Sequence, residues 1–368
     1  MGFIFILISS MLFYFIGTEL IPDLTHNKIL RVIFWLLHLL LFLLLISAPF
    51  VSRLRKNIDK TKMSSMIQWM AYNLMGFYFV LMSFLLVKAL IGTFTDDWYL
   101  SGVALVLTMI HMLFGYYLAR KPPEIKTTEI KLNYLHSQLN QLKIVQLSDV
   151  HIDQTTDPDY ADQLVEKANS LHPDIIVLTG DIVDGFVKDL EVKVTPLKNL
   201  KARYGVFYIP GNHEYYWNFN EWMHFFKSLN FELLINENKI LNIGESKLLI
   251  AGTHDLAAHR MNRLQKCDPD LALKTEQTVD YKILLTHQPN AIKLIKNEKA
   301  DLVLSGHTHA GQFFPANLLI YFFQKYVKGL YLVKDTYLYV NQGTGYWGPA
   351  NRLGTSMEIS EIVLVKNI

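Results

Sequence analysis

The chain has 368 residues, with 35 Lys and Arg against 33 Asp and Glu, a net charge of +2, and 51% hydrophobic residues. A charge this close to neutral and this evenly mixed gives no support to nucleic-acid binding driven by electrostatics. The single cysteine, Cys267, excludes an internal disulfide framework and a cysteine-based zinc site. Any bound metal must therefore be held by histidines and carboxylates.

The charges are distributed unevenly along the chain. Residues 1–120 contain nine basic and five acidic residues, whereas the rest of the chain contains 26 and 28. Crossing a bilayer takes about 20 mostly apolar residues, and four stretches of the first part meet this requirement. We therefore predict a transmembrane domain over 1–120, with four helices at about 1–20, 29–50, 66–92 and 98–119.

Basic residues indicate how these helices are oriented. The loop at 51–62 contains five basic residues, and the turn before the last span contains two acidic ones. They are Arg53, Arg55, Lys56, Lys60 and Lys62 in the loop, and Asp96 and Asp97 in the turn. Because basic loops stay cytoplasmic, we expect a multi-pass protein of the inner or plasma membrane with everything after Arg120 in the cytoplasm. An alternative for the first segment is a secretory signal peptide. The segment, however, lacks the basic n-region and the cleavage site of a signal peptide.

Few ionisable residues interrupt the predicted spans. His38 and His111 lie within apolar runs, and an ionisable group in a membrane is a functional hypothesis by default. We interpret both as neutral side chains packed between helices. No acidic or basic chain runs through the spans, which argues against a proton or ion pathway.

The remainder of the chain has the pattern of an α/β domain. Pro122 and Pro123 break the last helix and open a polar stretch, so we predict a linker over 121–141 and a domain over 142–368. In that domain, runs of four to six apolar residues alternate with amphipathic stretches, as in strand–helix–strand units. Ligands of such sheets bind beyond the carboxyl ends of the strands, and here His, Asp or Asn follows each apolar run.

Five short motifs follow these predicted strands in chain order: D-x-H, GD-x-x-D, GNH-E, a single H and GH-x-H. They contain Asp149 and His151, then Asp181 and Asp184, then Asn212, His213 and Glu214, then His287, then His307 and His309. In type and order they resemble the motifs of the calcineurin-like metallophosphoesterase superfamily. The segments GTHD, SGHTHAGQ and YVNQGTGYWGPANRLG are similar to the membrane-anchored YkuE- and YaeI-like branch, and the resemblance extends over about 142–365.

This resemblance implies a four-layer αββα sandwich and two divalent metal ions. By resemblance, Asp149, His151, Asp181 and His309 would hold the first metal, and Asp181, Asn212, His287 and His307 would hold the second. Since no thiolate is present, Mn, Fe and Zn all suit the nitrogen and oxygen ligands. The resemblance also makes His213 the general acid, with Asp184 orienting its ring. The alternative for Asp184 is a turn residue that caps the next helix.

The substrate implied by the resemblance is a phosphate ester. A phosphodiester or pyrophosphate is favoured, because Gly185 follows Asp184 and Glu214 follows His213 where protein phosphatases of this superfamily carry arginines. A lipid-linked substrate such as a UDP-diacylglucosamine-type molecule is one hypothesis. The alternatives are a phosphoesterase of soluble nucleotides that uses the helices only as an anchor, and a signalling or scaffold protein with a retired catalytic fold.

Two further features bear on the substrate. We predict Arg260, Arg263 and Arg352 as substrate-binding residues, although the first two could equally form the solvated face of a helix. The stretch 313–333 is unusually apolar and aromatic. It could lie in the membrane surface beside the metal site, or it could be core packing of the sandwich.

Overall fold

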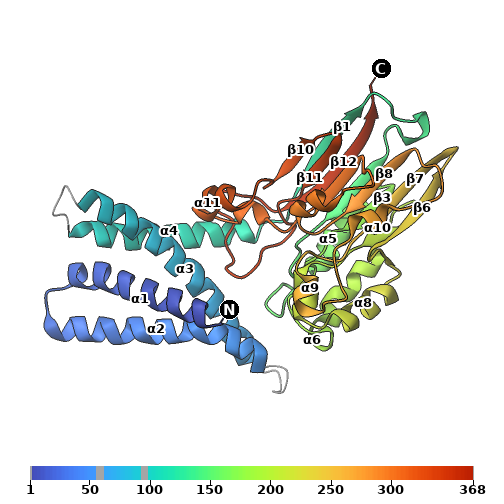
Figure 1. Cartoon of the computed structure of the whole chain (residues 1–368). Helices are drawn as coiled ribbons and strands as arrows, with labels where there is room; N and C mark the ends of the chain where they lie inside the picture. The colour runs from blue at the N-terminus through green and yellow to red at the C-terminus, as the bar shows by residue number, and fades with distance from the viewer. Residues whose placement is uncertain (1, 55–61, 93–97, 368) are drawn as a thin grey trace. The chain divides into compact units, whose positions relative to one another are not determined.

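The structure of the protein, a computed structural model, describes residues 2–54, 62–92 and 98–367 (Figure 1). Most of the predicted basic loop, and Asp96 and Asp97, lie outside the described residues. The chain divides into two compact units. The first comprises Met1–Arg120, Phe313–Pro315 and Gly348–Leu353, and the second comprises Lys121–Gln312, Ala316–Trp347 and Gly354–Ile368.

Four helices build the first unit: α1 (Gly2–Leu24), α2 (Lys28–Leu54), α3 (Lys62–Gly92) and α4 (Tyr99–Ala119). Three of them are long and apolar enough to cross a membrane, over 28–46, 65–91 and 99–119. The first of the four predicted spans, over about 1–20, stays a prediction, because these three helices are the ones found among the described residues. The C-terminal part of α1 contains the acidic residues Glu19 and Asp23.

Apolar side chains from all four helices form the core of this unit. It contains Ile16, Leu45, Tyr78, Leu81, Leu85 and Ala104. His38 lies within the bundle, where Nε2 is 2.9 Å from the carbonyl oxygen of Phe13 and Nδ1 is 2.8 Å from the Tyr78 hydroxyl. This is the packing between helices that we expected for His38.

Two six-stranded sheets form the second unit. The first has the order β1 (Glu124–Leu132), β12 (Glu358–Lys366), β2 (Lys143–Leu147), β3 (Ile175–Leu178), β4 (Val206–Tyr208), β5 (Glu232–Leu233). Strands β2 to β5 are parallel to one another, and β12 is antiparallel to β2. The second sheet has the order β10 (Gly329–Val333), β11 (Thr336–Val340), β9 (Leu302–Ser305), β8 (Tyr281–Leu285), β7 (Ser246–Gly252), β6 (Glu237–Ile243). Its central strands β11, β9, β8 and β7 are parallel.

Helices cover the outer faces of the two sheets. The helices that pack against these faces are α5 (Tyr160–Asn169), α6 (Val187–Val194), α8 (Phe219–Ser228) and α10 (Pro269–Leu273). The unit also contains α7 (Asn212–Tyr216), α9 (Ala258–Met261) and α11 (Ala316–Phe323). Short 3-10 turns add η1 (Ser137–Leu139), η2 (Thr195–Asn199), η3 (Pro289–Leu294) and η4 (His309–Gly311).

Three apolar cores hold these layers together. The central core joins the inner faces of the two sheets, for example Ile144 and Val177 with Ile283 and Leu304. A second core packs the outer face of the first sheet against α5, α6 and α8, and a third packs the outer face of the second sheet against α10 and η3. The α/β fold with four αββα layers is therefore confirmed.

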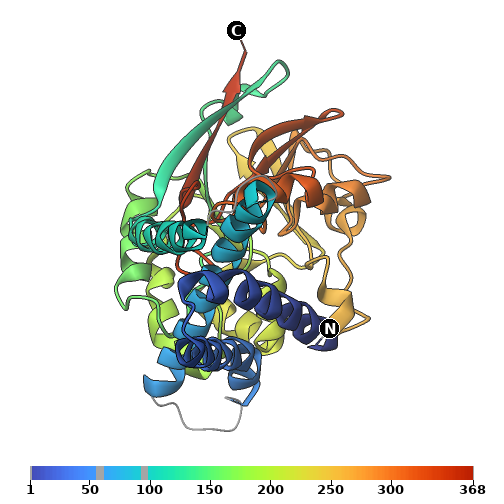
Figure 2. The ribbon, with the colours of Figure 1, turned by 90° about the vertical axis from the view of Figure 1, so that its left-hand side faces the viewer.

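The predicted linker contains part of the sheet. Strand β1 pairs in parallel with β12 along its whole length, from Glu124 opposite Glu358 to Leu132 opposite Lys366 (Figure 2). Its sequence, EIKTTEIKL, is polar because the strand lies at the edge of the sheet and most of its side chains are exposed. The two prolines therefore end α4 without opening an unstructured linker.

Candidate metal centre

Parallel strands of both sheets deliver the predicted site residues at their carboxyl ends, as the general rule for α/β sheets predicts. In the first sheet, Asp149 and His151 follow β2, Asp181 and Asp184 follow β3, and Asn212 and His213 follow β4. In the second sheet, His287 follows β8, and His307 and His309 follow β9. The structure brings all nine residues together.

The chain turns sharply at each of these strand ends. Five of the residues, Asp149, His151, Asp181, His307 and His309, have φ between 49° and 71°, a region that residues with a side chain seldom adopt. Such backbone strain is typical of functional sites. Gly306 allows the closest approach, because a Cβ atom there would lie 2.0 Å from the Ser148 hydroxyl and 2.1 Å from Asp149 Oδ2.

One group of ligands surrounds Asp149. His151 Nε2 lies 3.0 Å from His309 Nε2, and His309 Nε2 lies 3.3 Å from Asp149 Oδ1. The Asp149 carboxylate also accepts hydrogen bonds from the backbone N–H of His307 and from the Ser148 hydroxyl. The arrangement turns two imidazole nitrogens and a carboxylate oxygen toward one point, as metal ligands require.

A second group contains Asp181, His287 and His307. His287 Nε2 lies 3.1 Å from Asp181 Oδ2 and 3.2 Å from His307 Nδ1. The other nitrogen of His287, Nδ1, is 2.8 Å from the Thr179 carbonyl oxygen. A proton on Nδ1 would donate to that carbonyl and leave Nε2 unprotonated, which is the tautomer that a metal ligand needs.

Asp181 and Asn212 complete the arrangement. Asp181 Oδ2 is also 3.9 Å from His151 Nε2, so this carboxylate lies beside both groups. Asn212 is buried, and within the described chain its Oδ1 has no hydrogen-bond partner. Because a buried amide oxygen without a partner is costly, Asn212 fits the role of a metal ligand.

The charges of the site also call for a cation. Asp149 and Asp181 are almost completely buried, and over the described residues their ion-pair partners are all histidines. Buried carboxylates are stable only when they are paired or bound to a metal. The donor set of imidazoles, carboxylates and one amide oxygen therefore fits divalent metal ions.

His213 stands beside these groups, held by Asp184. The Asp184 carboxylate contacts His213 Nδ1, accepts from Trp217 Nε1 at 3.3 Å, and lies 2.9 Å from His151 Nδ1. Burial alone would lower the pKa of His213, but Asp184 and Asp181 together outweigh it and raise the pKa to about 9. Asp184 therefore faces two histidines, and the N-cap position of α6 is Phe186, so the helix-cap alternative does not describe it.

Sequence reasoning gave Glu214 no role, although it is part of the GNHE motif. Its buried carboxylate accepts hydrogen bonds from the backbone N–H groups of Gly211 at 2.7 Å, Asp181 at 3.0 Å and Ile182 at 2.8 Å. Glu214 thus ties the loop after β3 to the loop after β4. Its position directly after His213 in the sequence is the signal that could have identified Glu214 as part of the site.

Two exposed aromatic rings flank His213 and were also missed. The ring centre of Tyr216 is 5.2 Å from that of His213, and the ring centre of Trp347 is 5.8 Å from it. Tyr216 is 49% exposed and Trp347 is 41% exposed. Gln312 fixes Trp347 through two reciprocal 2.9 Å hydrogen bonds between its side-chain amide and the backbone of Trp347. Large exposed aromatic residues beside a histidine are suited to contact a substrate.

The predicted substrate-binding arginines lie in different surroundings. Arg260, in α9, and Arg263 are exposed, and the charge of Arg260 opposes the rise that burial causes in the pKa of Tyr216. Arg352 belongs to the first unit and is completely buried, with its backbone N–H donating to the Gly115 carbonyl. The structure thus places Arg260 near Tyr216, the residue whose ring lies beside His213. Arg352, in contrast, is not exposed.

Comparison with known proteins finds relatives of this chain. The sequence model of the calcineurin-like phosphoesterases matches residues 142–311. The transmembrane protein with metallophosphoesterase domain of Bos taurus is 36% identical over 72% of this chain, and the match covers 62% of its own length. An uncharacterized metallophosphoesterase of Aquifex aeolicus is 32% identical over 68% of this chain and 93% of its own length. The uncharacterized metallophosphoesterase YkuE of Bacillus subtilis is 30% identical over 63% of this chain and 82% of its own length.

Proposed function

Because this chain belongs to the calcineurin-like metallophosphoesterases, we propose that it is a metal-dependent hydrolase of phosphodiester or pyrophosphate bonds. The observation that carries this proposal is the convergence of two His and Asp groups next to His213, with Asp181 of the second group also beside His151 of the first. The intact set of ligands disfavours the alternative of a scaffold protein with a retired site.

The residues of the site would hold two metal ions. Asp149, His151, His309 and Asp181 would bind one, and Asp181, Asn212, His287 and His307 would bind the other, with Mn, Fe or Zn as the candidates. When bound, the metals would supply a nucleophilic hydroxide and neutralise charge on the phosphoryl oxygens. The Asn212 oxygen, which has no hydrogen-bond partner among the described residues, and the 2.8 Å contact of His287 Nδ1 with the Thr179 carbonyl oxygen support this assignment.

His213 and Asp184 would act on the leaving group. Cleavage of a phosphate ester expels an alkoxide, which needs a proton from a general acid. The Asp184 contact occupies Nδ1 of His213, so that Nε2 is the nitrogen available to donate. A pKa raised to about 9 keeps this imidazole protonated near neutral pH. Asp184 would therefore be a positioning residue for the acid His213.

A diester or pyrophosphate is the substrate that the site supports best. The site's ion pairs within the described residues involve histidines and no arginine or lysine, and a dianionic monoester would need more cationic donors than a diester. Tyr216 and Trp347 would contact the organic part of the leaving group, and Arg260 and Arg263 a further anionic group. Arg352, which is buried in the first unit, has no substrate role in this proposal.

A lipid-linked substrate is supported by helix α11. None of its residues is buried, and Phe322 and Phe323 are 84% and 81% exposed. The alternative of core packing therefore does not describe α11, although other parts of 313–333 are buried, for example Tyr326 and Val327. An exposed aromatic helix of this kind could insert into a membrane surface and help the enzyme to reach a substrate such as a UDP-diacylglucosamine-type lipid.

The positive-inside rule supports a cytoplasmic site, with the enzyme anchored in the inner or plasma membrane by its apolar helices. A phosphatase and β-galactosidase reporter pair fused after Ile368 tests this orientation. We expect the cytoplasmic reporter to be active, and activity of the exported reporter would contradict the assignment.

The activity is tested with the full chain in detergent, supplied with Mn²⁺. We expect it to hydrolyse bis(p-nitrophenyl) phosphate faster than p-nitrophenyl phosphate, and to cleave a nucleotide-linked lipid pyrophosphate. Faster turnover of soluble dinucleotides than of the lipid would favour a soluble substrate. Absence of hydrolysis of every phosphoester, in a chain that has bound its metals, would contradict the proposal.

A further inference from the structure

A cluster of charged side chains joins three helices of the first unit. Lys88 Nζ, on α3, lies 2.7 Å from Asp23 Oδ2 and 3.2 Å from Glu19 Oε2, both on α1. The hydroxyl of Ser101, on α4, donates to Asp23 Oδ2 at 2.6 Å and to the Glu19 carbonyl at 3.1 Å. These side chains lie near one end of each helix and do not form a charged chain through the helices. Glu19 and Lys88 are 69 residues apart in the sequence, so the cluster is invisible without the fold.

The cluster carries more negative than positive charge. Two carboxylates share one ammonium group, and among the ion pairs of the described residues Lys88 is the only cation that contacts either acid. The side chains of Lys88, Asp23 and Glu19 are only 16%, 21% and 31% exposed. A surplus carboxylate next to apolar helices is costly unless a further cation pairs with it.

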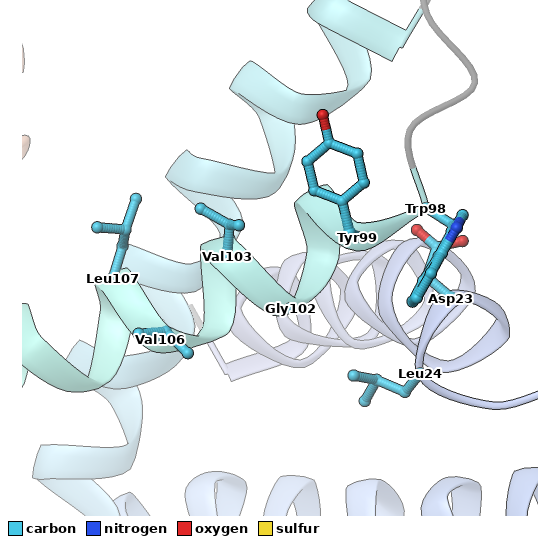
Figure 3. Close-up of a pocket in the computed structure, with 8 residues that line it drawn as sticks. All are labelled: Asp23, Leu24, Trp98, Tyr99, Gly102, Val103, Val106 and Leu107. Carbon is cyan, nitrogen blue, oxygen red and sulfur yellow. The ribbon is translucent and has the colours of Figure 1, made fainter.

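A groove of about 450 Å³ opens beside Asp23. Figure 3 shows Asp23 next to Trp98 at one end, with side chains of α4 following along the helix. The walls are otherwise apolar or aromatic: Leu24, Trp98, Tyr99, Val103, Val106 and Leu107. Gly102 also lines the groove, and a Cβ atom there would meet nothing within 4 Å. From Tyr99 to Leu107 the helix rises about 12 Å, which is long enough to cover part of an acyl chain.

We propose that this groove binds an amphiphile with a primary ammonium headgroup, such as an aminophospholipid. The ammonium group would pair with the carboxylate of Asp23, the acid that lines the groove, because Lys88 is shared with Glu19 and leaves the pair of acids with a net negative charge. Trp98 and Tyr99 offer aromatic faces for the cation, and the valine and leucine side chains of α4 would contact the acyl chain. This site is separate from the metal centre, and it does not depend on the proposed hydrolase activity.

The test uses the full chain in nanodiscs of phosphatidylglycerol that contain a minor fraction of phosphatidylethanolamine with the same acyl chains. Native mass spectrometry then measures the lipid that stays bound to each protein molecule. For the wild type we expect one retained phosphatidylethanolamine, enriched about tenfold over its share of the bilayer. Far-UV circular dichroism checks that every variant keeps its helices.

Two variants and one control make the result specific. Asp23→Asn removes the charge and keeps the shape, whereas Gly102→Leu fills the groove and leaves the charges in place. We expect both to lose the enrichment. Leu113→Phe enlarges a side chain of α4 that is 72% exposed and lies outside the groove, and we expect it to retain the lipid like the wild type. Retention of both lipids at the bilayer ratio by the wild type, or enrichment that persists in either variant, would overturn the proposal.

Discussion

Both units of this protein hold carboxylates close together, but they balance the charge in different ways. In the second unit, the buried acids Asp149 and Asp181 face histidines. In the first unit, Glu19 and Asp23 face Lys88, a cation that belongs to the chain. A neutral imidazole can accept a metal ion, whereas an ammonium group excludes one. The comparison teaches that the residues around a partly or fully buried carboxylate decide whether it binds a metal for chemistry or pairs with ammonium groups.

The two clusters also differ in how rigidly the backbone presents them. Five residues of the metal centre have positive φ and follow short buried strands, so their side chains converge without freedom to turn away. Glu19, Asp23 and Lys88 extend from regular helices and reach their partners with flexible side chains. Changes in the second unit should therefore affect chemistry, and changes in the first should affect stability and lipid contact.

The largest effect is expected from Asp181→Asn, which removes a carboxylate of the second ligand group that also lies beside His151 of the first. We expect kcat/KM for bis(p-nitrophenyl) phosphate to fall by about 10³-fold or more, equivalent to about 4 kcal/mol of transition-state stabilisation. Asp335→Asn, in the exposed turn between β10 and β11, is the matched control and should keep full activity. An active Asp181→Asn protein would remove the basis for a bridging carboxylate.

His213→Ala should have the next largest effect. Loss of a general acid typically costs about 10²- to 10⁴-fold in rate, and we expect the loss in kcat. The metal content should stay unchanged, because His213 is predicted to be an acid and not a ligand. If His213→Ala loses metal and activity together, the residue is a ligand and its assignment here is incorrect.

Lys88→Met tests the other side of the comparison. It leaves the carboxylates of Glu19 and Asp23 without a cation. We expect the loss of these ion pairs to lower the free energy of unfolding by about 2–3 kcal/mol. This is less than for a fully buried ion pair, because the side chains are partly exposed. Unfolding of the full chain in SDS, followed by circular dichroism, measures the change. The triple variant Lys88→Met, Glu19→Gln, Asp23→Asn should recover much of the lost stability. A single variant as stable as the wild type would show that the ion pairs contribute little.

The smallest effect concerns helix α11. Replacing Phe322 and Phe323 with Ser should lower turnover of a lipid-linked substrate in vesicles about tenfold, which corresponds to about 1.4 kcal/mol of lost membrane contact. Hydrolysis of bis(p-nitrophenyl) phosphate should stay at the wild-type rate. Leu332→Ser, which replaces a 63% exposed apolar residue of β10, is the matched control and should leave turnover of both substrates unchanged. Equal losses on both substrates would point to a structural role for α11.

Much of the site could be predicted from the sequence, because its residues come directly after short apolar strands whose order determines where their ends meet. Asp149, Asp181 and His309 belong to such motifs. Strand β1 was missed because an edge strand has exposed polar side chains and follows two prolines. Trp347 and Gln312 were missed because they are 35 residues apart, and their contact depends on how the two segments pack. The first unit's charged cluster was missed for the same reason.

The most direct test of the central claim is the metal content of the purified full-length protein, measured by inductively coupled plasma mass spectrometry after extensive dialysis. The account predicts about two divalent transition-metal ions per chain in the wild type and a clear loss in Asp181→Asn. A wild-type protein that holds no divalent metal under conditions in which it hydrolyses phosphodiesters would contradict it.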